Sequence, residues 1–190
     1  MKNVTAVSRS DKRATGWTRD LVILLDRLIY RMARHWLWMV NGLVALYAGL
    51  PVLAPCLMAM GWRLPSQAIY FVYSFLCHQM PQRSFFICGH QMAFCQRCAA
   101  IYGSVLVGGL LFPLVHCWLK PLPWKLYIAL NVPLAIDGLG QLVGLWESTP
   151  FSRVLTGSLF GLASVWLCYP YLEQGFADIR QDIGEKLHLE

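Results

Sequence analysis

Residues 36–60 read WLWMVNGLVALYAGLPVLAPCLMAM and contain no charged side chain. At about 1.5 Å per residue, a helix of this length can cross a hydrocarbon core about 30 Å thick. Pro51 and Pro55 are expected to kink such a helix, and Arg63 marks the far interface. We therefore predict that the first transmembrane helix lies here.

The rest of the chain has the composition of a membrane protein. Of its 190 residues, 57% are hydrophobic and only 14% are charged, so the chain has more apolar surface than one water-facing domain covers. Further apolar stretches follow at residues 67–76, 98–118, 124–145 and 153–172. In the last of these, Gly157 and Gly161 have the spacing of small residues that let helices pack closely.

These patterns predict an all-α fold, a polytopic helical membrane protein with four to five transmembrane helices. We divide the chain into a basic N-terminal segment at 1–34, a helical bundle at 35–172 and a polar tail at 173–190. The tail has mixed charge and is expected to be helical.

Basic residues are concentrated at the N-terminus, where eight of the 16 Lys and Arg residues come before residue 35. This excess predicts a cytoplasmic N-terminus in the bacterial inner membrane. Residues 1–15 are polar and expected to be disordered, whereas Asp20–Arg34 has leucines and arginines at helical spacing, which predicts an amphipathic interfacial helix. Since the charge is juxtamembrane, the expected partners are membrane lipids with anionic headgroups, and not nucleic acid.

A polar segment at residues 77–98, CHQMPQRSFFICGHQMAFCQRC, interrupts the apolar pattern. It holds four of the seven cysteines and two of the five histidines. Thiolate and imidazole are the ligands that zinc prefers, and a Cys-x-x-Cys pair supplies two from one turn. The segment therefore predicts a zinc or iron site, with packing and helix capping as the plain alternative. The predicted ligands are Cys77, His78, Cys95 and Cys98, with Cys88 and His90 as further candidates.

The apolar stretch before this segment is short. Either its helix reaches the cytoplasmic interface near Pro81, or it breaks inside the membrane and Met80–Phe94 forms a re-entrant element. Counting spans from a cytoplasmic N-terminus puts the cysteines at the cytoplasmic mouth of the bundle and the turn Lys120–Lys125 outside. On that side thiols stay reduced, which disfavours a structural disulfide.

Asp137 is the only acidic residue within an apolar span, and Gln141 lies one turn below it on the same helix face. An ionisable group inside a membrane is costly and normally pairs within the bundle. Arginines are its expected partners, and they can also bind a phosphate or carboxylate in bidentate fashion. A purely structural ion pair is an equal alternative. The predicted polar site comprises Arg83, Arg97, Tyr102, Asp137, Gln141 and Arg153.

These motifs resemble a family of predicted membrane proteins that is numbered two thousand and eighty-five among the domains of unknown function. The resemblance covers about residues 70–172 and implies a membrane-embedded module with no established activity. The residues that carry it are Cys77-His78-Gln79, Arg83-Ser84-Phe85, Gly89, Cys95-x-Arg97-Cys98, Ile101-Tyr102-x-Ser104, Asp137-Gly138-x-x-Gln141, Arg153, Gly157 and Gly161.

The sequence supports three hypotheses for function. The first is a binding or transport-type protein whose Cys/His/Arg segment meets Asp137 and Gln141 at one mouth of the bundle. The second is a quinone-linked thiol oxidoreductase that uses Cys95 and Cys98. The third is a metal-dependent lipid-phosphate enzyme, and no catalytic residue is assigned for it.

Overall fold

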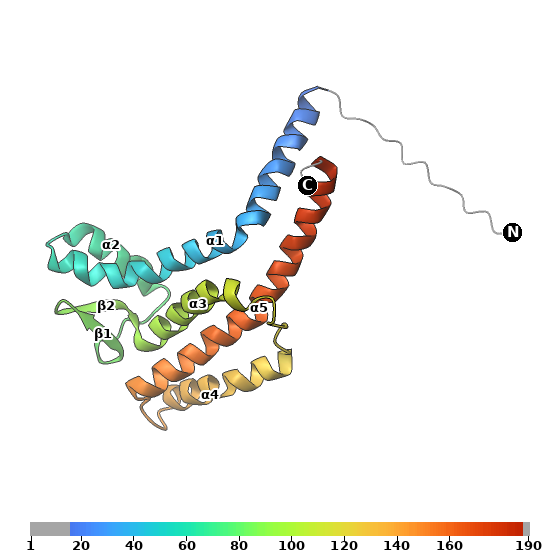
Figure 1. Ribbon diagram of the computed structural model, residues 1–190. Helices are drawn as coiled ribbons and strands as arrows, with labels where there is room; N and C mark the ends of the chain where they lie inside the picture. The colour runs from blue at the N-terminus through green and yellow to red at the C-terminus, as the bar shows by residue number, and fades with distance from the viewer. Residues whose placement is uncertain (1–15, 188–190) are drawn as a thin grey trace. The chain divides into compact units, whose positions relative to one another are not determined.

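The computed structural model describes residues 16–187, which form five helices and one small antiparallel hairpin (Figure 1). The predicted all-α fold is therefore confirmed, with the hairpin as an addition. The expectation for residues 1–15 lies outside the described residues. The elements are α1 (Trp17–Ala59), α2 (Arg63–Ser74), the 3-10 turn η1 (Pro81–Arg83), β1 (Ser84–Ile87), β2 (His90–Cys95), α3 (Gln96–Val115), α4 (Trp124–Leu142) and α5 (Pro150–Leu187).

The chain divides into two compact units. One holds residues 36–175, and the other holds the N-terminal part of α1 up to His35 and the C-terminal part of α5 from Phe176. The backbone of α1 departs from helical geometry at His35, with φ −112° and ψ 15°. In the smaller unit, Leu21, Leu24 and Leu28 are exposed.

Within the larger unit, four helices alternate in direction. Asn41 Nδ2 of α1 donates to the carbonyl oxygen of Gly109 at 2.9 Å, and the rings of Tyr47 and Tyr102 lie 4.7 Å apart, so α1 and α3 are antiparallel. The hydroxyls of Tyr127 and Ser164 lie 3.2 Å apart. At the other end Ser152 Oγ donates to Asp137 Oδ1 at 3.3 Å, so α4 and α5 are antiparallel too.

Helices α1, α3 and α5 are long and apolar enough to cross a membrane. The 19-residue α4 lies beside α5 and completes a group of four. These helices agree with a polytopic membrane protein.

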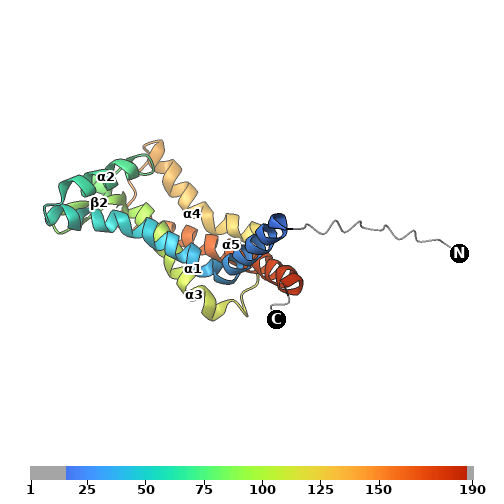
Figure 2. The ribbon, with the colours of Figure 1, turned by 90° about the horizontal axis from the view of Figure 1, so that it is seen from above.

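The predicted span at residues 67–76 is wrong. Helix α2 has only 12 residues, about 18 Å of helix, which is too short for a hydrocarbon core of about 30 Å. It instead folds back against α1, where Ser66 Oγ donates to the carbonyl oxygen of Ala54 at 2.8 Å. Figures 1 and 2 show α2 and the hairpin together at one end of this unit. The chain therefore returns to the end at which α1 finishes.

An aromatic cluster joins the hairpin to the helices. Phe94 of β2 is only 1% exposed and stacks on Tyr102 of α3, with ring centroids 5.2 Å apart. Tyr73 of α2 meets Phe94 edge-on at 5.0 Å and donates its hydroxyl proton to the carbonyl oxygen of Tyr47 at 2.7 Å. Cys77 is buried in the same cluster, so this packing fixes the polar segment against the bundle.

The small residues of α5 pack against α3, as predicted. A Cβ atom on Gly157 would come within 2.8 Å of the carbonyl oxygen of Arg97. A Cβ on Gly161 would lie 2.0 Å from Ser104 Oγ and 2.5 Å from the carbonyl oxygen of Ile101. The backbone of α3 leaves no room for a side chain at either position, so the two glycines set the distance between these helices.

We predict that Gly161→Ala lowers the free energy of unfolding by about 1–3 kcal/mol, the usual range for overpacking a closely packed site. The measurement is thermal or denaturant-induced unfolding in detergent. Gly175→Ala on the same helix is the matched control, because a Cβ there meets nothing within 4 Å. Equal stability of both variants would contradict the close approach of α3 and α5.

Candidate functional site

Three thiols meet at the end of the bundle where α2 and the hairpin lie. The Sγ atoms of Cys77, Cys95 and Cys98 all lie within 4.8 Å of one another. Cys77 is 5% exposed, and its sulfur accepts a hydrogen bond from the backbone N–H of Cys95 at 3.1 Å. Three of the four main predicted ligands are therefore within reach of one small ion.

The local fold explains this meeting. Cys95 ends β2 and is the N-cap of α3, with φ −74° and ψ 161°, so Cys98 follows it on the first turn of the helix. Cys77 comes just after α2, where its backbone N–H donates to the carbonyl oxygen of Tyr73 at 2.9 Å. Because Tyr73 belongs to the aromatic cluster, the packing of α2 delivers the third thiol.

The surroundings of Cys95 favour its thiolate. Hydrogen bonds from the Cys77 thiol, and then from the Cys98 thiol, lower the pKa of Cys95. Burial opposes this shift, and the backbone N–H groups of Cys98 and Arg97 at the start of α3 add smaller contributions that lower the pKa further. A thiolate is the form that binds metals and attacks disulfides.

The other predicted ligands do not join the thiols. His78 is exposed and lines the cavity beside the cysteines, but its ring is not part of the three-ligand group. Cys88 and His90 lie at the turn of the hairpin, where Cys88 has φ 52° and is exposed. The hairpin carries both residues away from the thiols, so they are not candidate ligands.

Asp137 has the arginine partner that the sequence predicted. Its carboxylate forms an ion pair with Arg97, in which the two side chains are 13% and 21% exposed. Arg97 also donates to Ser148 Oγ at 3.3 Å, and Ser152 Oγ donates to the second carboxylate oxygen. These contacts tie the start of α3 to α4 and to the start of α5.

Arg153 is the most buried of the three arginines, with 6% of its surface exposed. Its Nη1 donates to Gln96 Oε1 at 3.3 Å, and its Nε has no hydrogen-bond partner among residues 16–187. The side-chain amide of Gln141 is oriented with its oxygen toward the arginines. In the opposite orientation its NH2 group, a donor, would face the N–H donors of the guanidiniums. That oxygen then accepts from Arg153 Nη2 at 3.2 Å and from Arg83 Nη2 at 3.0 Å.

A cavity of about 330 Å³ brings the thiols and the arginines together. Its walls come from the loop after α2, the starts of α3 and α5 and the end of α4. Asp137 does not line the cavity itself, but it forms an ion pair with Arg97, which does. Eight of the predicted site residues line this cavity: Cys77, His78, Arg83, Cys95, Arg97, Cys98, Gln141 and Arg153.

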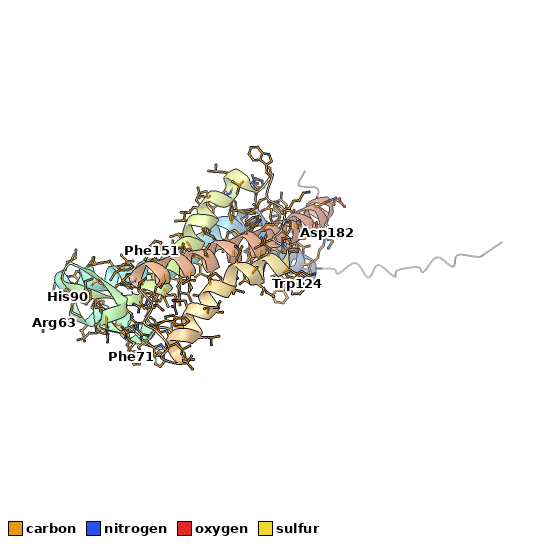
Figure 3. All side chains as sticks on the ribbon, turned by 90° about the horizontal axis from the view of Figure 1, so that it is seen from below. Arg63, Phe71, His90, Trp124, Phe151 and Asp182 are labelled. Carbon is orange, nitrogen blue, oxygen red and sulfur yellow. The ribbon has the colours of Figure 1, made fainter. Side chains whose placement is uncertain are left out.

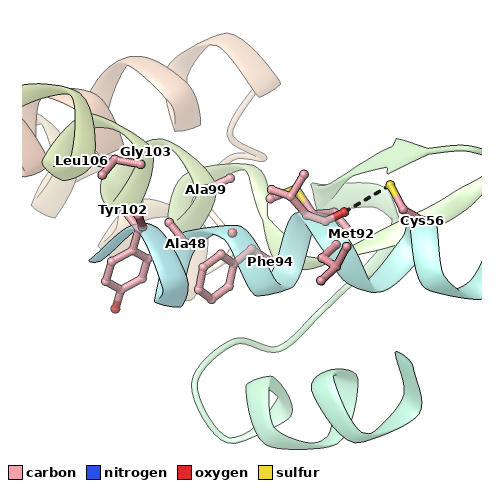
Figure 4. Close-up of a pocket in the computed structure, with 12 residues that line it drawn as sticks. Ala48, Cys56, Met92, Phe94, Ala99, Tyr102, Gly103 and Leu106 are labelled. Atoms are coloured by element: carbon pink, nitrogen blue, oxygen red, sulfur yellow. Dashed lines mark hydrogen bonds between the residues drawn. The ribbon is translucent and has the colours of Figure 1, made fainter. Parts of the chain in front are cut away.

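Tyr102 does not belong to this polar site. It lies in the aromatic cluster and lines a different cavity of about 470 Å³ between α1, β2 and α3 (Figure 4). That cavity is apolar, and Met92 and Phe94 also face it. The prediction failed because Tyr102 lies one helical turn from Cys98, yet the aromatic rings beside it hold it on another side of α3.

The site and the start of the first span lie at opposite ends of the larger unit. Trp36 donates its indole N–H to Glu173 at 2.7 Å and packs against Phe112 near the end of α3, whereas the thiols surround its start. Figure 3 labels His90 and Arg63 at one end of this unit and Trp124 at the other.

The sequence predicts the thiols and the start of the first span on the same side, whereas the structure puts them at opposite ends of the larger unit. The turn Lys120–Lys125 follows the end of α3 that packs against Trp36, and Trp166 Nε1 of α5 donates to the carbonyl oxygen of Lys120 at 3.0 Å. The turn, which the sequence predicts at the end opposite to the start of the first span, therefore lies at the same end of the larger unit as Trp36. Because α2 folds back against α1, α3 runs antiparallel to α1, opposite to the relative direction that a further span at residues 67–76 would give.

Sequence reasoning missed three polar residues of the site, Gln96, Ser148 and Ser152. Gln96 stands between Cys95 and Arg97 in the motif, so its position in the polar segment was a usable signal. The two serines flank the start of α5 and look like ordinary turn residues. Only the fold shows that they contact Arg97 and Asp137.

Comparison with known proteins finds a family whose model covers the residues of this site. The family model described as predicted membrane protein (DUF2085) matches residues 77–167, which include the thiols and the arginines. An uncharacterized protein of Methanocaldococcus jannaschii is 47% identical over 112 residues, 57% of this chain and 71% of the relative. One from Methanothermobacter thermautotrophicus is 32% identical over 95 residues, 47% of this chain and 81% of the relative. No solved structure matches.

The lowered pKa of Cys95 predicts the pH dependence of its alkylation in metal-free protein. An unfolded thiol loses its thiolate as the pH falls through about 8.5. In the folded protein the thiolate persists below that value, so alkylation of Cys95 should stay nearly constant between about pH 8 and pH 6. Site-resolved mass spectrometry measures the rate, and the urea-unfolded chain is the control. A folded rate that falls in parallel with the unfolded one would contradict the prediction.

Proposed function

This chain belongs to the DUF2085 family of predicted membrane proteins, and we propose that it is a binding or transport-type protein that holds a transition-metal ion on Cys77, Cys95 and Cys98. The observation that carries the proposal is the meeting of three sulfur atoms within 4.8 Å. Cys95 and Cys98 are neighbours at the start of α3, but Cys77 comes from the loop after α2, so the Cys-x-x-Cys spacing alone does not explain the cluster.

The donor set fits zinc or iron. Both ions bind thiolates, and tetrahedral sites built from sulfur are typical of them. Cys95 supplies a stabilised thiolate to begin coordination. All three cysteines line the cavity, so a fourth ligand would come from a molecule in it, as in zinc sites that keep one position open.

We place this site at the extracytoplasmic mouth of the bundle. Of the 16 Lys and Arg residues, eight precede Trp36 in the chain and two, Arg180 and Lys186, follow Glu173. Lys120 and Lys125 lie on the turn at the same end of the bundle as Trp36 and Glu173. The remaining four are Arg63 and the three arginines of the cavity. Cytoplasmic flanks are rich in Lys and Arg, which supports an N-terminus inside and a site outside.

A thiol oxidoreductase is the second candidate. Cys95 and Cys98 form a Cys-x-x-Cys pair at a helix N-terminus, where a thiolate is favoured. In such a reaction the two thiols would form a disulfide and transfer two electrons and two protons to a quinone, which becomes a quinol. The extracytoplasmic placement favours this candidate more than the predicted cytoplasmic one did, because disulfide exchange occurs on that side.

Metal analysis of the purified full-length protein tests the first proposal. We expect about one zinc or iron ion per chain, and loss of that ion in Cys95→Ser and Cys98→Ser because each removes one of three ligands. Cys168→Ser is the matched control, since Cys168 is exposed on α5 and lies outside the cluster. Metal-free protein whose thiols are oxidised by a quinone would instead favour the oxidoreductase.

Native cysteines can report the side of the membrane. Cys88 on the hairpin and Cys117 after α3 are both exposed and lie at opposite ends of the bundle. We expect a membrane-impermeant maleimide to label Cys88 in intact cells and Cys117 only after the membrane is opened. Cys88→Ser and Cys117→Ser assign the labels, and the reverse pattern would overturn the extracytoplasmic placement.

A further inference from the structure

The cavity beside the thiols has more positive than negative charge. Arg83, Arg97 and Arg153 line it, whereas none of the described residues in its wall carries a carboxylate. Asp137, just beyond the wall, offsets the charge of Arg97. A single thiolate in the cluster would offset a second charge. A divalent ion on three thiolates has the same net charge of one negative unit, so one positive charge remains with or without a metal.

The remaining charge is held in a buried position. Arg153 is 6% exposed, and the partners of its guanidinium are the neutral amide oxygens of Gln96 and Gln141. Its buried Nε finds no acceptor in the part of the chain that the structure describes. A buried guanidinium is unfavourable unless its charge is compensated, and the direct partners of Arg153 are neutral, so a further negative group in the cavity would stabilise it.

Two guanidiniums converge at this point. Arg83 from η1 and Arg153 from α5 both donate to the same oxygen of Gln141, at 3.0 Å and 3.2 Å. Like charges held this close repel each other unless an anion lies between them. Planar guanidiniums that approach from two elements can each donate paired N–H groups to the oxygens of one anion.

From this juxtaposition of Arg83, Arg153 and Gln141 in one cavity, we infer that the protein binds a phosphate group beside the thiol cluster. A phosphate offers several acceptor oxygens and more than one negative charge, which matches two converging guanidiniums better than a single carboxylate does. The volume of about 330 Å³ lies at the lower end of the range for small-molecule sites, roughly 300–1,000 Å³. The phosphate is either a free ion or the headgroup of a lipid.

Two binding measurements on the full-length protein test this inference and separate the sources. One is equilibrium dialysis of the detergent-solubilised protein against radiolabelled inorganic phosphate. The other is native mass spectrometry after incubation with phosphatidylcholine vesicles that contain or lack phosphatidic acid. Arg83→Gln is the main variant, because Arg83 is only half-buried and its loss is compatible with folding. Arg83→Lys retains the charge without the planar fork.

We expect Arg83→Gln to weaken phosphate binding about 10- to 100-fold, as loss of a charged hydrogen-bonding group does. Arg83→Lys should recover part of it. Arg63→Gln is the matched control, since Arg63 begins α2 and lies outside the cavity. Binding of the inorganic ion supports a free phosphate ligand, and selective retention of phosphatidic acid supports a lipid headgroup.

The inference is overturned if neither probe binds the wild-type protein, or if Arg83→Gln binds both probes as tightly as the wild type does. An equal loss in Arg63→Gln would also overturn it, because general surface charge would then explain the binding. Metal content measured on the same samples separates this result from the proposed metal site: phosphate binding that fails while three-cysteine metal binding persists refutes the phosphate site alone.

Discussion

A helix of 12 residues reaches about 18 Å, and a membrane core of about 30 Å cannot be crossed with it. Because of this length limit, α2 folds back against α1 instead of spanning the membrane. Its polar flanks must remain at the end of the bundle where α1 finishes, because lipid offers no hydrogen bonds to the loop that follows. The hairpin and the thiols are therefore collected at one mouth, and α3 begins there.

The same end concentrates the polar contacts between helices. Arg97, Asp137 and Ser152 connect α3, α4 and α5 in one network, while Gly157 and Gly161 bring α5 against the backbone of α3. Close approach and ion pairing act together here, since helices without a hydrophobic driving force between them depend on packing and on polar contacts. The start of α3 is thus a fixed platform, and it carries two of the three thiols.

Thiols and guanidiniums share a single cavity, so each affects what the other can bind. The stabilised thiolate of Cys95 favours metal coordination, and a divalent metal on three thiolates would carry a net negative charge in the cavity that Arg153 also lines. The membrane-spanning helices surround this chemistry, and the apolar cavity lined by Tyr102 lies on a different side of α3. A metal and an oxyanion are therefore compatible occupants of one site.

The sequence by itself determined the membrane class, because the uncharged run at 36–60 and the scarcity of charge admit no other solvent. It also identified most of the polar site, since Cys95, Cys98, Arg97 and Asp137 are costly in lipid and stand out wherever they occur. Only the tertiary structure decided that α2 turns back, which makes α3 antiparallel to α1 and places the site opposite Trp36. Contacts between distant segments also decided that Cys77 joins the thiols while His78, Cys88 and His90 do not, because ligand spacing along a chain does not fix the direction of a side chain.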